Sequence, residues 1–268
     1  PGVCLSAQDL RVSSDGQASD DEIAVLELNG LCKNFGGLQA TRHVSFRIMA
    51  GDRKAIISPN GAGKTTLFNL ITGIYPSSAG HIFLFGRDVT KWQSHQRTAL
   101  GMARTFQVTS LFPKLKVIDN VLLAIQGLRS SKFVMWRPLS SYNEIHDKAH
   151  RLLEQASFLD RKDVEVRNLS HGEQRQLEIV LGLASDPKIL LLDEPAAGLS
   201  SGESTEMAHF LMKLDPGLAI LLIEHDMDVV FDVCDEISVL HFGELLETGT
   251  PEQIKKSRRV QEIYLGTG

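Results

Sequence analysis

Hydrophobic and polar residues alternate with period two near both ends of the chain, which predicts strands there. The alternation occupies residues 23–28 and 44–48 and returns at residues 237–246, around a turn at Gly243. Because successive side chains of a strand point to opposite faces, each stretch would place one face on a core and the other in solvent. We therefore expect antiparallel strands at both ends.

Continuous apolar runs in the rest of the chain predict strands that are buried on both faces. Residues 188–192 and 219–223 are such runs, and residues 54–58 and 81–85 also have strand character. Parallel sheets covered by helices require this kind of strand. Helical spacing occurs between these runs, and the expected helices span residues 64–72, residues 173–184 and a short stretch from residue 251. The pattern predicts an α/β fold with a mostly parallel sheet and an antiparallel β subdomain.

The middle of the chain loses the strand pattern and takes on a helical one. Apolar residues that share one helical face there are Ile145, Ala149, Leu152, Leu153 and Ala156. A one-sided apolar stripe is typical of a helix packed on a core. We expect an inserted helical subdomain at about residues 108–172, within one domain spanning residues 22–268. Residues 1–21 are polar and acidic, and we expect a disordered N-terminal tail.

A glycine-rich turn lies between an apolar strand and a helix, and it has the composition of a phosphate-binding loop. Gly61 and Gly63 lack a Cβ, so the main-chain N–H groups can wrap a triphosphate closely. Lys64 can reach the β- and γ-phosphates, and the hydroxyl of Thr65 can bind Mg²⁺. Ser58 stands where the usual pattern has its first glycine. A Cβ is tolerable there if φ is negative, so we expect weakened ATP binding at most.

Acidic residues and a histidine follow the two buried strands. Asp193 and Glu194 come directly after one strand, and His225 follows the other. Carboxylates at the carboxyl end of a buried strand are costly unless they bind something. We expect Asp193 to hold Mg²⁺ through its water shell, Glu194 to orient or deprotonate an attacking water, and His225 to reach a γ-phosphate. The alternative is a pair of solvated loop acids.

Three further places are candidates with an ordinary structural alternative. Phe35 could stack on a purine or pack on the sheet. Gln107 could bring its carboxamide oxygen to Mg²⁺ and to the attacking water, or be a surface glutamine. Ser170 and Glu173 form a capping box that opens a helix. The same helix start, with Ser170 and Gly172, also presents N–H groups and a hydroxyl to a phosphate.

Composition excludes several other classes of protein. The chain has 268 residues, 43% of them hydrophobic, so it can bury a large core. A net charge of -5 with dispersed Lys and Arg argues against a nucleic-acid partner. No apolar run approaches the roughly 20 residues that span a bilayer. Its three cysteines lie far apart, which indicates neither a zinc site nor a disulfide framework, so we expect a cytoplasmic compartment.

In this order, the motifs resemble the nucleotide-binding subunit of ATP-binding cassette (ABC) transporters from residue 23 to residue 266. Residues 58–66 are similar to Walker A and residues 189–193 to Walker B, while Gln107 resembles the Q-loop glutamine and His225 the switch histidine. The resemblance identifies the architecture as a P-loop NTPase core with two subdomains, and the cofactors as ATP and Mg²⁺. The motifs and the resemblance together give the expected site residues. The expected nucleotide-binding residues are Phe35, Asn60, Gly61, Ala62, Gly63, Lys64, Thr65, Thr66, Ser170 and Gly172. The expected catalytic residues are Glu194, His225 and Gln107, and the expected metal-binding residues are Thr65, Gln107 and Asp193.

Within the family, four stretches resemble the ATPase of branched-chain amino acid importers. They are residues 103–107, 193–199, 223–227 and 262–266. The urea and amide importers share much of this, and so does the lipopolysaccharide-export ATPase, with a different Q-loop context. The implied partners are a second ABC ATPase subunit, identical or paralogous, integral membrane permease subunits and, indirectly, a solute-binding protein. The resemblance implies a peripheral location on the cytoplasmic face of the plasma membrane. We expect a permease helix near residues 107–116, since a lobe hinged on a γ-phosphate sensor can convert hydrolysis into movement.

Departures from the family keep two other readings open. Residues 169–174 are similar to the signature and residues 198–200 to the D-loop, but His171 replaces a glycine, and Ser200 replaces the usual aspartate. One alternative is a soluble cassette ATPase acting on nucleic acid or ribosomes, which the acidic charge and the single cassette oppose. The other is a degenerate cassette that binds ATP as the structural half of a heterodimer, which Glu194 and His225 oppose.

Overall fold

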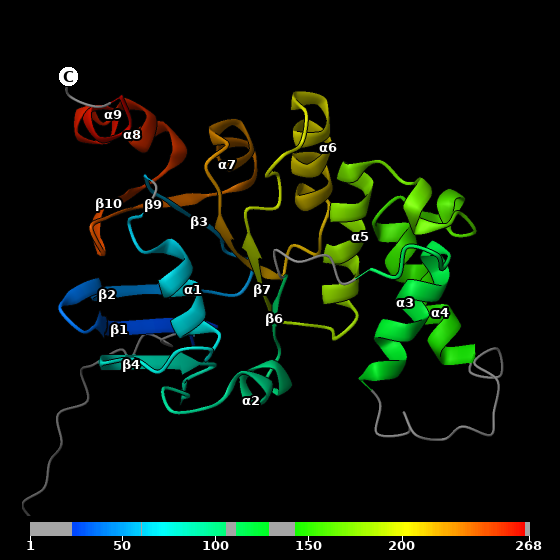
Figure 1. Cartoon of the computed structure of the whole chain (residues 1–268), viewed down its shortest axis with the longest axis horizontal. Coiled ribbons are helices and arrows are strands. Elements are labelled where there is room, and N and C mark those ends of the chain that lie inside the picture. The colour runs from blue at the N-terminus through cyan, green and yellow to red at the C-terminus, as the bar shows by residue number, and fades with distance from the viewer. Residues whose placement is uncertain (1–22, 60, 106–110, 129–142, 266–268) are drawn as a thin grey trace, which may run out of the picture.

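The computed structural model describes residues 23–59, 61–105, 111–128 and 143–265 (Figure 1). The predicted disordered tail at residues 1–21 lies outside these ranges, and so do Asn60 and Gln107. The boundaries of the inserted helical subdomain, about residues 108–172, also fall partly on residues outside the description and stay a prediction.

Two sheets form the framework. The strands are β1 (Leu26–Phe35), β2 (Leu38–Ile48), β3 (Arg53–Ile57), β4 (Ala79–Leu84), β5 (Arg87–Asp88), β6 (Met102–Arg104), β7 (Ile189–Asp193), β8 (Ala219–Ile223), β9 (Glu236–His241) and β10 (Glu244–Gly249). One sheet has the order β10-β9-β3-β8-β7-β6, in which only β10 runs antiparallel to its neighbour. The other has the order β2-β1-β4-β5 and is antiparallel throughout. The predicted α/β architecture, with a mostly parallel sheet and an antiparallel sheet, is confirmed.

Helices cover the larger sheet and extend to one side of it (Figure 1). They are α1 (Lys64–Ile71), α2 (Ser94–Ala99), α3 (Val117–Gly127), α4 (Asn143–Gln155), α5 (His171–Leu183), α6 (Ser201–Met212), α7 (Met227–Val233), α8 (Pro251–Lys256) and α9 (Arg258–Leu265), with 3-10 helices η2 (Leu159–Arg161) and η3 (Val166–Asn168). Within the part of the chain that the structure describes, no helix is long and apolar enough to cross a membrane.

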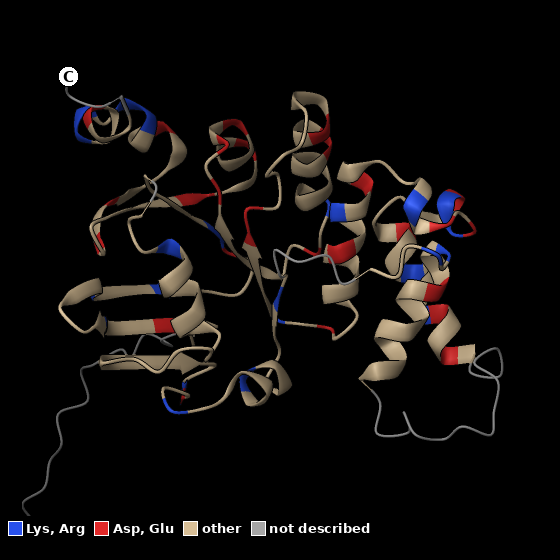
Figure 2. Ribbon diagram, in the orientation of Figure 1, with Lys and Arg blue, Asp and Glu red and all other residues tan. Residues whose placement is uncertain are grey.

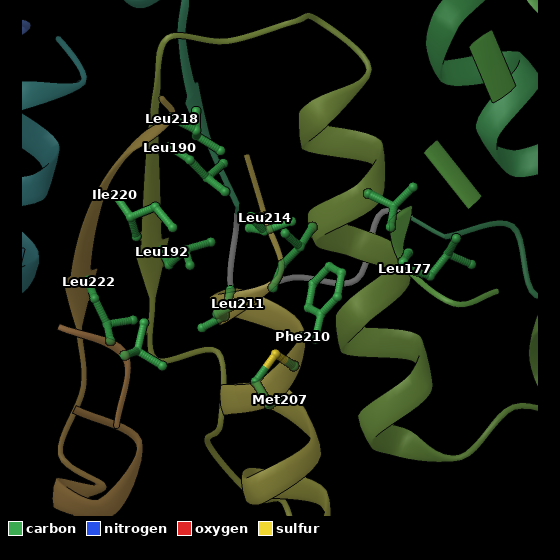
Figure 3. Close-up of a cluster of buried hydrophobic side chains, with 14 of the residues drawn as sticks. Leu177, Leu190, Leu192, Met207, Phe210, Leu211, Leu214, Leu218, Ile220 and Leu222 are labelled. Carbon is green, nitrogen blue, oxygen red and sulfur yellow. The ribbon is translucent and has the colours of Figure 1, made fainter. Parts of the chain in front are cut away.

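The central strands are buried on both faces, as their continuous apolar sequences predict. Leu190 and Leu192 of β7 point into a cluster with α5 and α6, which Figure 3 shows. Ile189 and Leu191 of the same strand belong to the core under the antiparallel sheet. Because side chains alternate along a strand, one run of leucines and isoleucines joins two hydrophobic cores. This packing holds the carboxyl ends of β7 and β8 in place.

The helical region between α3 and α5 has its own packed interior. All five residues of the predicted apolar stripe on α4 and just after it are buried, with exposures of 7% or less. They pack in the same cluster as Val117, Val121 and Ile125 of α3. The helical spacing in the sequence therefore identified the correct face.

The structure corrects three local expectations. Residues 102–104, for which the sequence predicted no strand, form the edge strand β6, which pairs with β7 and is too short to show a period. Phe35, for which the sequence predicted no element, is the last residue of β1, and Ile23, where the predicted alternation begins, precedes that strand and is 69% exposed. Helix α5 begins at His171, two residues before the expected start, because Ser170 is its N-cap.

Candidate functional site

The phosphate-binding loop joins β3 to α1. Gly63 is the N-cap of α1, with a φ of 105°, and Gly61 has a φ of 80°. A Cβ on Gly63 would lie 2.4 Å from the carbonyl oxygen of Ala40, so no other residue fits there. The first turn of α1 has neither a side-chain cap nor an acidic residue. The positive end of this helix is therefore available to bind an anion.

Lys64 lies folded back over the loop. Its Nζ donates a hydrogen bond of 2.7 Å to the carbonyl oxygen of Ser58. Burial lowers the pKa of Lys64, while the negative charges of Glu194, Glu224 and Asp193 oppose that shift. The negative charges of three carboxylates thus stabilise the charged form of this one buried ammonium. Ser58 itself does not have a positive φ, so the condition for a Cβ at this position is met.

Asp193 ends β7, and its side chain is only 2% exposed. One carboxylate oxygen accepts a hydrogen bond of 2.8 Å from Arg104 of β6. The same guanidinium donates to Asn69 Oδ1 at 2.7 Å and to Thr72 Oγ1 at 3.2 Å, at the end of α1. Arg104 therefore joins the edge strand, the strand that carries Asp193 and the helix of the phosphate-binding loop.

Glu194 and His225 meet at the ends of two adjacent strands. Asp193 and Ile223 are register partners of β7 and β8, so the residues after them leave the sheet side by side. His225 Nδ1 lies 3.9 Å from Glu194 Oε1. Glu194 has a φ of 50°, in the left-handed region that a side chain disfavours, and its N–H donates to the carbonyl of Ile223 at 2.8 Å. The turn is held in this conformation by its neighbours.

Glu224 is a fully buried carboxylate behind these two residues. Its Oε1 accepts a hydrogen bond of 2.8 Å from the N–H of Ala196, in the turn after Glu194. Its Oε2 accepts one of 2.8 Å from the N–H of His225. Burial raises the pKa of Glu224, and these hydrogen bonds oppose the shift. One side chain thus ties the Glu194 turn to the His225 turn.

Phe35 lies beside the phosphate-binding loop. A cavity of about 340 Å³ is lined by Phe35, by the loop residues Gly61, Ala62 and Gly63, and by Thr66 of α1. The ring of Phe35 is held edge-on against Tyr75, with a centroid distance of 5.6 Å. The structure therefore brings the sequence-predicted aromatic to the glycines that follow it by more than 20 residues.

Ser170 and Gly172 lie elsewhere, at the start of α5. Ser170 Oγ accepts a hydrogen bond of 3.2 Å from the N–H of Glu173, which completes the predicted capping box. In Figure 1, α5 and α1 stand on opposite sides of β7. The structure therefore does not bring Ser170 and Gly172 to the phosphate-binding loop of the same chain.

The donor set near the phosphate-binding loop fits Mg²⁺. Thr65 on α1 supplies a hydroxyl oxygen and Asp193 a carboxylate oxygen, both hard ligands. The described residues contain no group of three or more His, Cys, Asp or Glu that could hold a metal by themselves. Such a site suits an ion that completes its shell with substrate phosphates and water. Gln107 and Asn60 belong to the residues that the structure leaves undescribed.

Three residues of this region, Arg104, Glu224 and Glu203, were assigned no role from the sequence alone. Arg104 and Glu224 sit inside stretches that resemble the family, yet only their burial reveals a role. Glu203 follows Ser200 with the spacing of a capping box, and this signal was available. It also contacts Gly172, at the start of another helix.

Comparison with known proteins agrees with this geometry. The family model described as "ABC transporter" matches residues 41–197. The chain is 39% identical over 249 residues to the "high-affinity branched-chain amino acid transport ATP-binding protein LivG" of Escherichia coli strain K12, covering 90% of this chain and 98% of that protein. It is 36% identical over 249 residues to BraF of Pseudomonas aeruginosa, described in the same words, with the same coverage.

A solved structure described as the ADP conformation of an ATP-binding cassette of an ABC transporter is also similar. Its TM-score is 0.81 at 28% identity, covering 91% of this chain and 99% of that one. The family match spans more than half of the chain, and it includes the phosphate-binding loop, the start of α5 and the end of β7. The chain therefore belongs to the ABC transporter family, as one of its ATP-binding cassettes.

Proposed function

We propose that this chain is the ATP-hydrolysing subunit of a transporter that imports branched-chain amino acids through a separate membrane permease. The observation that carries the hydrolytic part is the meeting of Glu194 and His225 at the strand ends, beside Asp193 and Lys64. The solute is supported by the names of LivG and BraF, which match over nearly their full lengths.

The phosphate-binding loop holds the triphosphate of ATP. The N–H groups around Gly61 and Gly63 wrap the phosphates, and Lys64 leaves Ser58 to neutralise the β- and γ-phosphate charge. The adenine stacks on Phe35, at the mouth of the cavity that also contains Ala62. Asn60 and Thr66 complete the loop contacts, as the family resemblance implies.

Thr65, Asp193 and Gln107 are the residues that would hold Mg²⁺. The ion supplies positive charge that stabilises the negative charge developing on the transferred phosphoryl group. Arg104 keeps the Asp193 carboxylate at a fixed place beside α1. Positioning of this kind accounts for much of the catalysis in phosphoryl transfer.

Glu194 orients or deprotonates the attacking water, and His225 contacts the γ-phosphate. Glu194 is 30% exposed and His225 58% exposed, so both side chains can reach a bound nucleotide. Glu224 fixes both turns through its two short hydrogen bonds. When Glu194 deprotonates the water, its carboxylate takes the proton. The turn that carries this carboxylate is held by the hydrogen bonds of Glu194 to Ile223 and of Ala196 to Glu224.

A second cassette completes each ATP site. Ser170 and Gly172 lie too far round the fold to serve their own phosphate-binding loop, which supports their use on the ATP of a partner subunit (Figure 1). The start of α5 offers a hydroxyl and N–H groups at the positive end of a helix. The partner is an identical or paralogous cassette.

The permease helix is proposed to dock near residues 107–116, of which residues 107–110 lie outside the description, and to extend into a groove beside β6. The groove has a volume of about 210 Å³ and is lined by Ala124 of α3, by Leu128 directly after α3, by Leu181 of α5, and by Arg104. Arg104 therefore faces both the groove and Asp193. Figure 2 shows Lys and Arg dispersed among Asp and Glu, which supports a protein partner rather than nucleic acid. The groove would face the membrane from the cytoplasmic side.

The first experiment measures ATP hydrolysis by the purified protein and by Glu194→Gln, with Mg²⁺ and with EDTA. Removal of the carboxylate should abolish turnover and leave ATP binding intact, and the variant should form a dimer in ATP. Glu206→Gln, an exposed residue of α6, is the matched control and should hydrolyse ATP normally. Equal hydrolysis by Glu194→Gln and the parent would refute the catalytic assignment.

To test the solute, the chain is co-expressed with candidate permease and binding-protein genes. Membrane vesicles containing the complex are then loaded with ATP for uptake assays. Uptake of labelled leucine, isoleucine or valine that depends on Glu194 is the expected result. Glu194-dependent uptake of urea or short amides, with no uptake of the three amino acids, would contradict the solute assignment and leave the ATPase assignment standing.

A further inference from the structure

Glu203 of α6 covers the main-chain N–H of Gly172. Its Oε1 accepts a hydrogen bond of 3.1 Å from Gly172, at the start of α5. Gly172 is buried, although Ser170 and His171 beside it are exposed. A Cβ on Gly172 would lie 3.1 Å from the Cβ and the Cγ of Glu203. A glycine at this position therefore lets the acidic side chain approach closely.

The carboxylate of Glu203 is held from its other side by Ser200. Its Oε2 accepts hydrogen bonds from the Ser200 N–H at 3.1 Å and from the Ser200 hydroxyl at 2.8 Å. Hydrogen bonds from the main chain of Ser200 and then of Gly172 lower the pKa of Glu203 to about 2. The side chain is therefore an anion at neutral pH. Ser200 is the residue that replaces the usual aspartate of the D-loop.

We infer that Glu203 is a positioning residue that occupies the phosphate-binding N–H of Gly172 until a partner subunit delivers ATP. The inference rests on the proposed function, in which Gly172 binds the γ-phosphate held by the second cassette. One N–H group makes one strong hydrogen bond, and two anions at the same helix start repel each other. The carboxylate and the phosphate therefore exclude each other at this position.

Closure of two cassettes on ATP must then displace Glu203 from Gly172. The displaced carboxylate keeps its contacts with Ser200, so the D-loop moves with it. In this arrangement Glu203 restrains dimerisation in the absence of a well-placed γ-phosphate. The residue does not touch the reacting atoms, and its effect is on the equilibrium between open and closed dimers.

The test measures the ATP-dependent dimer dissociation constant by sedimentation. Glu203→Gln and Glu203→Ala are made in the Glu194→Gln protein, which holds ATP without turnover. Ser200 Oγ accepts from the main-chain N–H of residue 203, so the α6 cap survives both changes. Glu206→Gln, on the same helix and exposed, is the matched control. A urea titration of each variant confirms folding.

Loss of the competing anion should tighten the dimer by on the order of tenfold, because a hydrogen bond to a charged group has to be broken in the parent. The tightening should be larger for Glu203→Ala than for Glu203→Gln and absent for Glu206→Gln. A residue that only supports the start of α5 would give the opposite sign, a weaker dimer.

An unchanged or weaker dimer in folded, ATP-binding Glu203 variants would overturn the inference and leave the proposed function intact. Failure of the Glu194→Gln parent to dimerise in ATP would instead refute the composite ATP site, and the inference with it. The two failures are distinguished by the parent alone.

Discussion

The guanidinium of Arg104 and the carboxylate of Asp193 form a buried ion pair, with 2.8 Å between nitrogen and oxygen and side-chain exposures of 10% and 2%. The pair links the edge strand β6 to the strand that carries the proposed metal ligand. Arg104 also bonds to Asn69 and Thr72 at the end of α1. One side chain thus holds together the elements on both sides of the nucleotide site.

Replacement of Arg104 by Met should therefore destabilise the protein. Removing one partner of a buried pair leaves an uncompensated charge and costs about 3–5 kcal/mol in the free energy of unfolding. Arg104→Lys should cost less, because it keeps the charge and loses the planar fork. Urea denaturation measures both. The exposed pair Lys116–Asp163, at 2.9 Å, is the control, and Lys116→Met should leave the urea midpoint unchanged.

Glu224→Ala should lower kcat without weakening ATP binding. The change leaves the N–H groups of Ala196 and His225 without their acceptor and releases both catalytic turns. Misplacement of reacting groups by about 1 Å costs on the order of 100-fold in rate. Steady-state ATPase assays and titration with a fluorescent ATP analogue separate kcat from affinity. Asp232→Ala, an exposed acid on α7, is the control and should keep full activity. A fall in affinity with unchanged kcat would contradict the assigned role.

Phe35→Ala should weaken ATP binding by about 5- to 150-fold, since base stacking on an aromatic ring contributes about 1–3 kcal/mol. Phe35→Trp should retain the affinity because it keeps a ring at the cavity. Calorimetric titration with ATP gives the dissociation constants. Phe112, which is 56% exposed and does not line this cavity, provides the control substitution to Ala. Equal affinity in Phe35→Ala and the parent would show that the adenine lies elsewhere.

The contribution of Glu203 to stability should depend on pH in the acidic range. Its folded pKa of about 2 lies below the ordinary value of 4.5, so the unfolded chain binds the proton more tightly. The stabilisation is complete above about pH 4.5 and is lost as the pH falls toward 2. The difference in urea midpoint between the parent and Glu203→Gln should therefore be constant from pH 7 to pH 5 and shrink from pH 4.5 to pH 3. A difference that grows on acidification would contradict the sign.

Features that depend on neighbours in the chain were predictable from the sequence. The apolar run at residues 219–223 is strand β8, and the run at residues 188–192 differs from β7 (Ile189–Asp193) by one residue at each end. Ser170 caps α5 through the predicted capping box, and Gly61 and Gly63 take the left-handed conformations that a phosphate-binding turn requires. Backbone conformation and local hydrogen bonds are decided within a few residues, so the sequence carries them directly.

Contacts between distant segments were decided only by the tertiary structure. Arg104 and Asp193 are 89 residues apart, and Glu203 and Gly172 are 31 apart. The residue types alone do not say that an arginine in the short edge strand β6 reaches a carboxylate at the end of the neighbouring strand β7. Its partner is chosen by the order β6-β7-β8 and by the packing of α1.

The sequence by itself determined the buried apolar strands, the phosphate-binding loop and the candidate catalytic residues, because each depends on spacing along the chain. The tertiary structure decided that Glu224 ties Glu194 to His225, that Phe35 ends a strand beside the loop, and that Glu203 covers Gly172. Burial makes these contacts matter, since a polar group taken from water must find its partner inside the fold. Which partner it finds depends on how the sheets and helices pack.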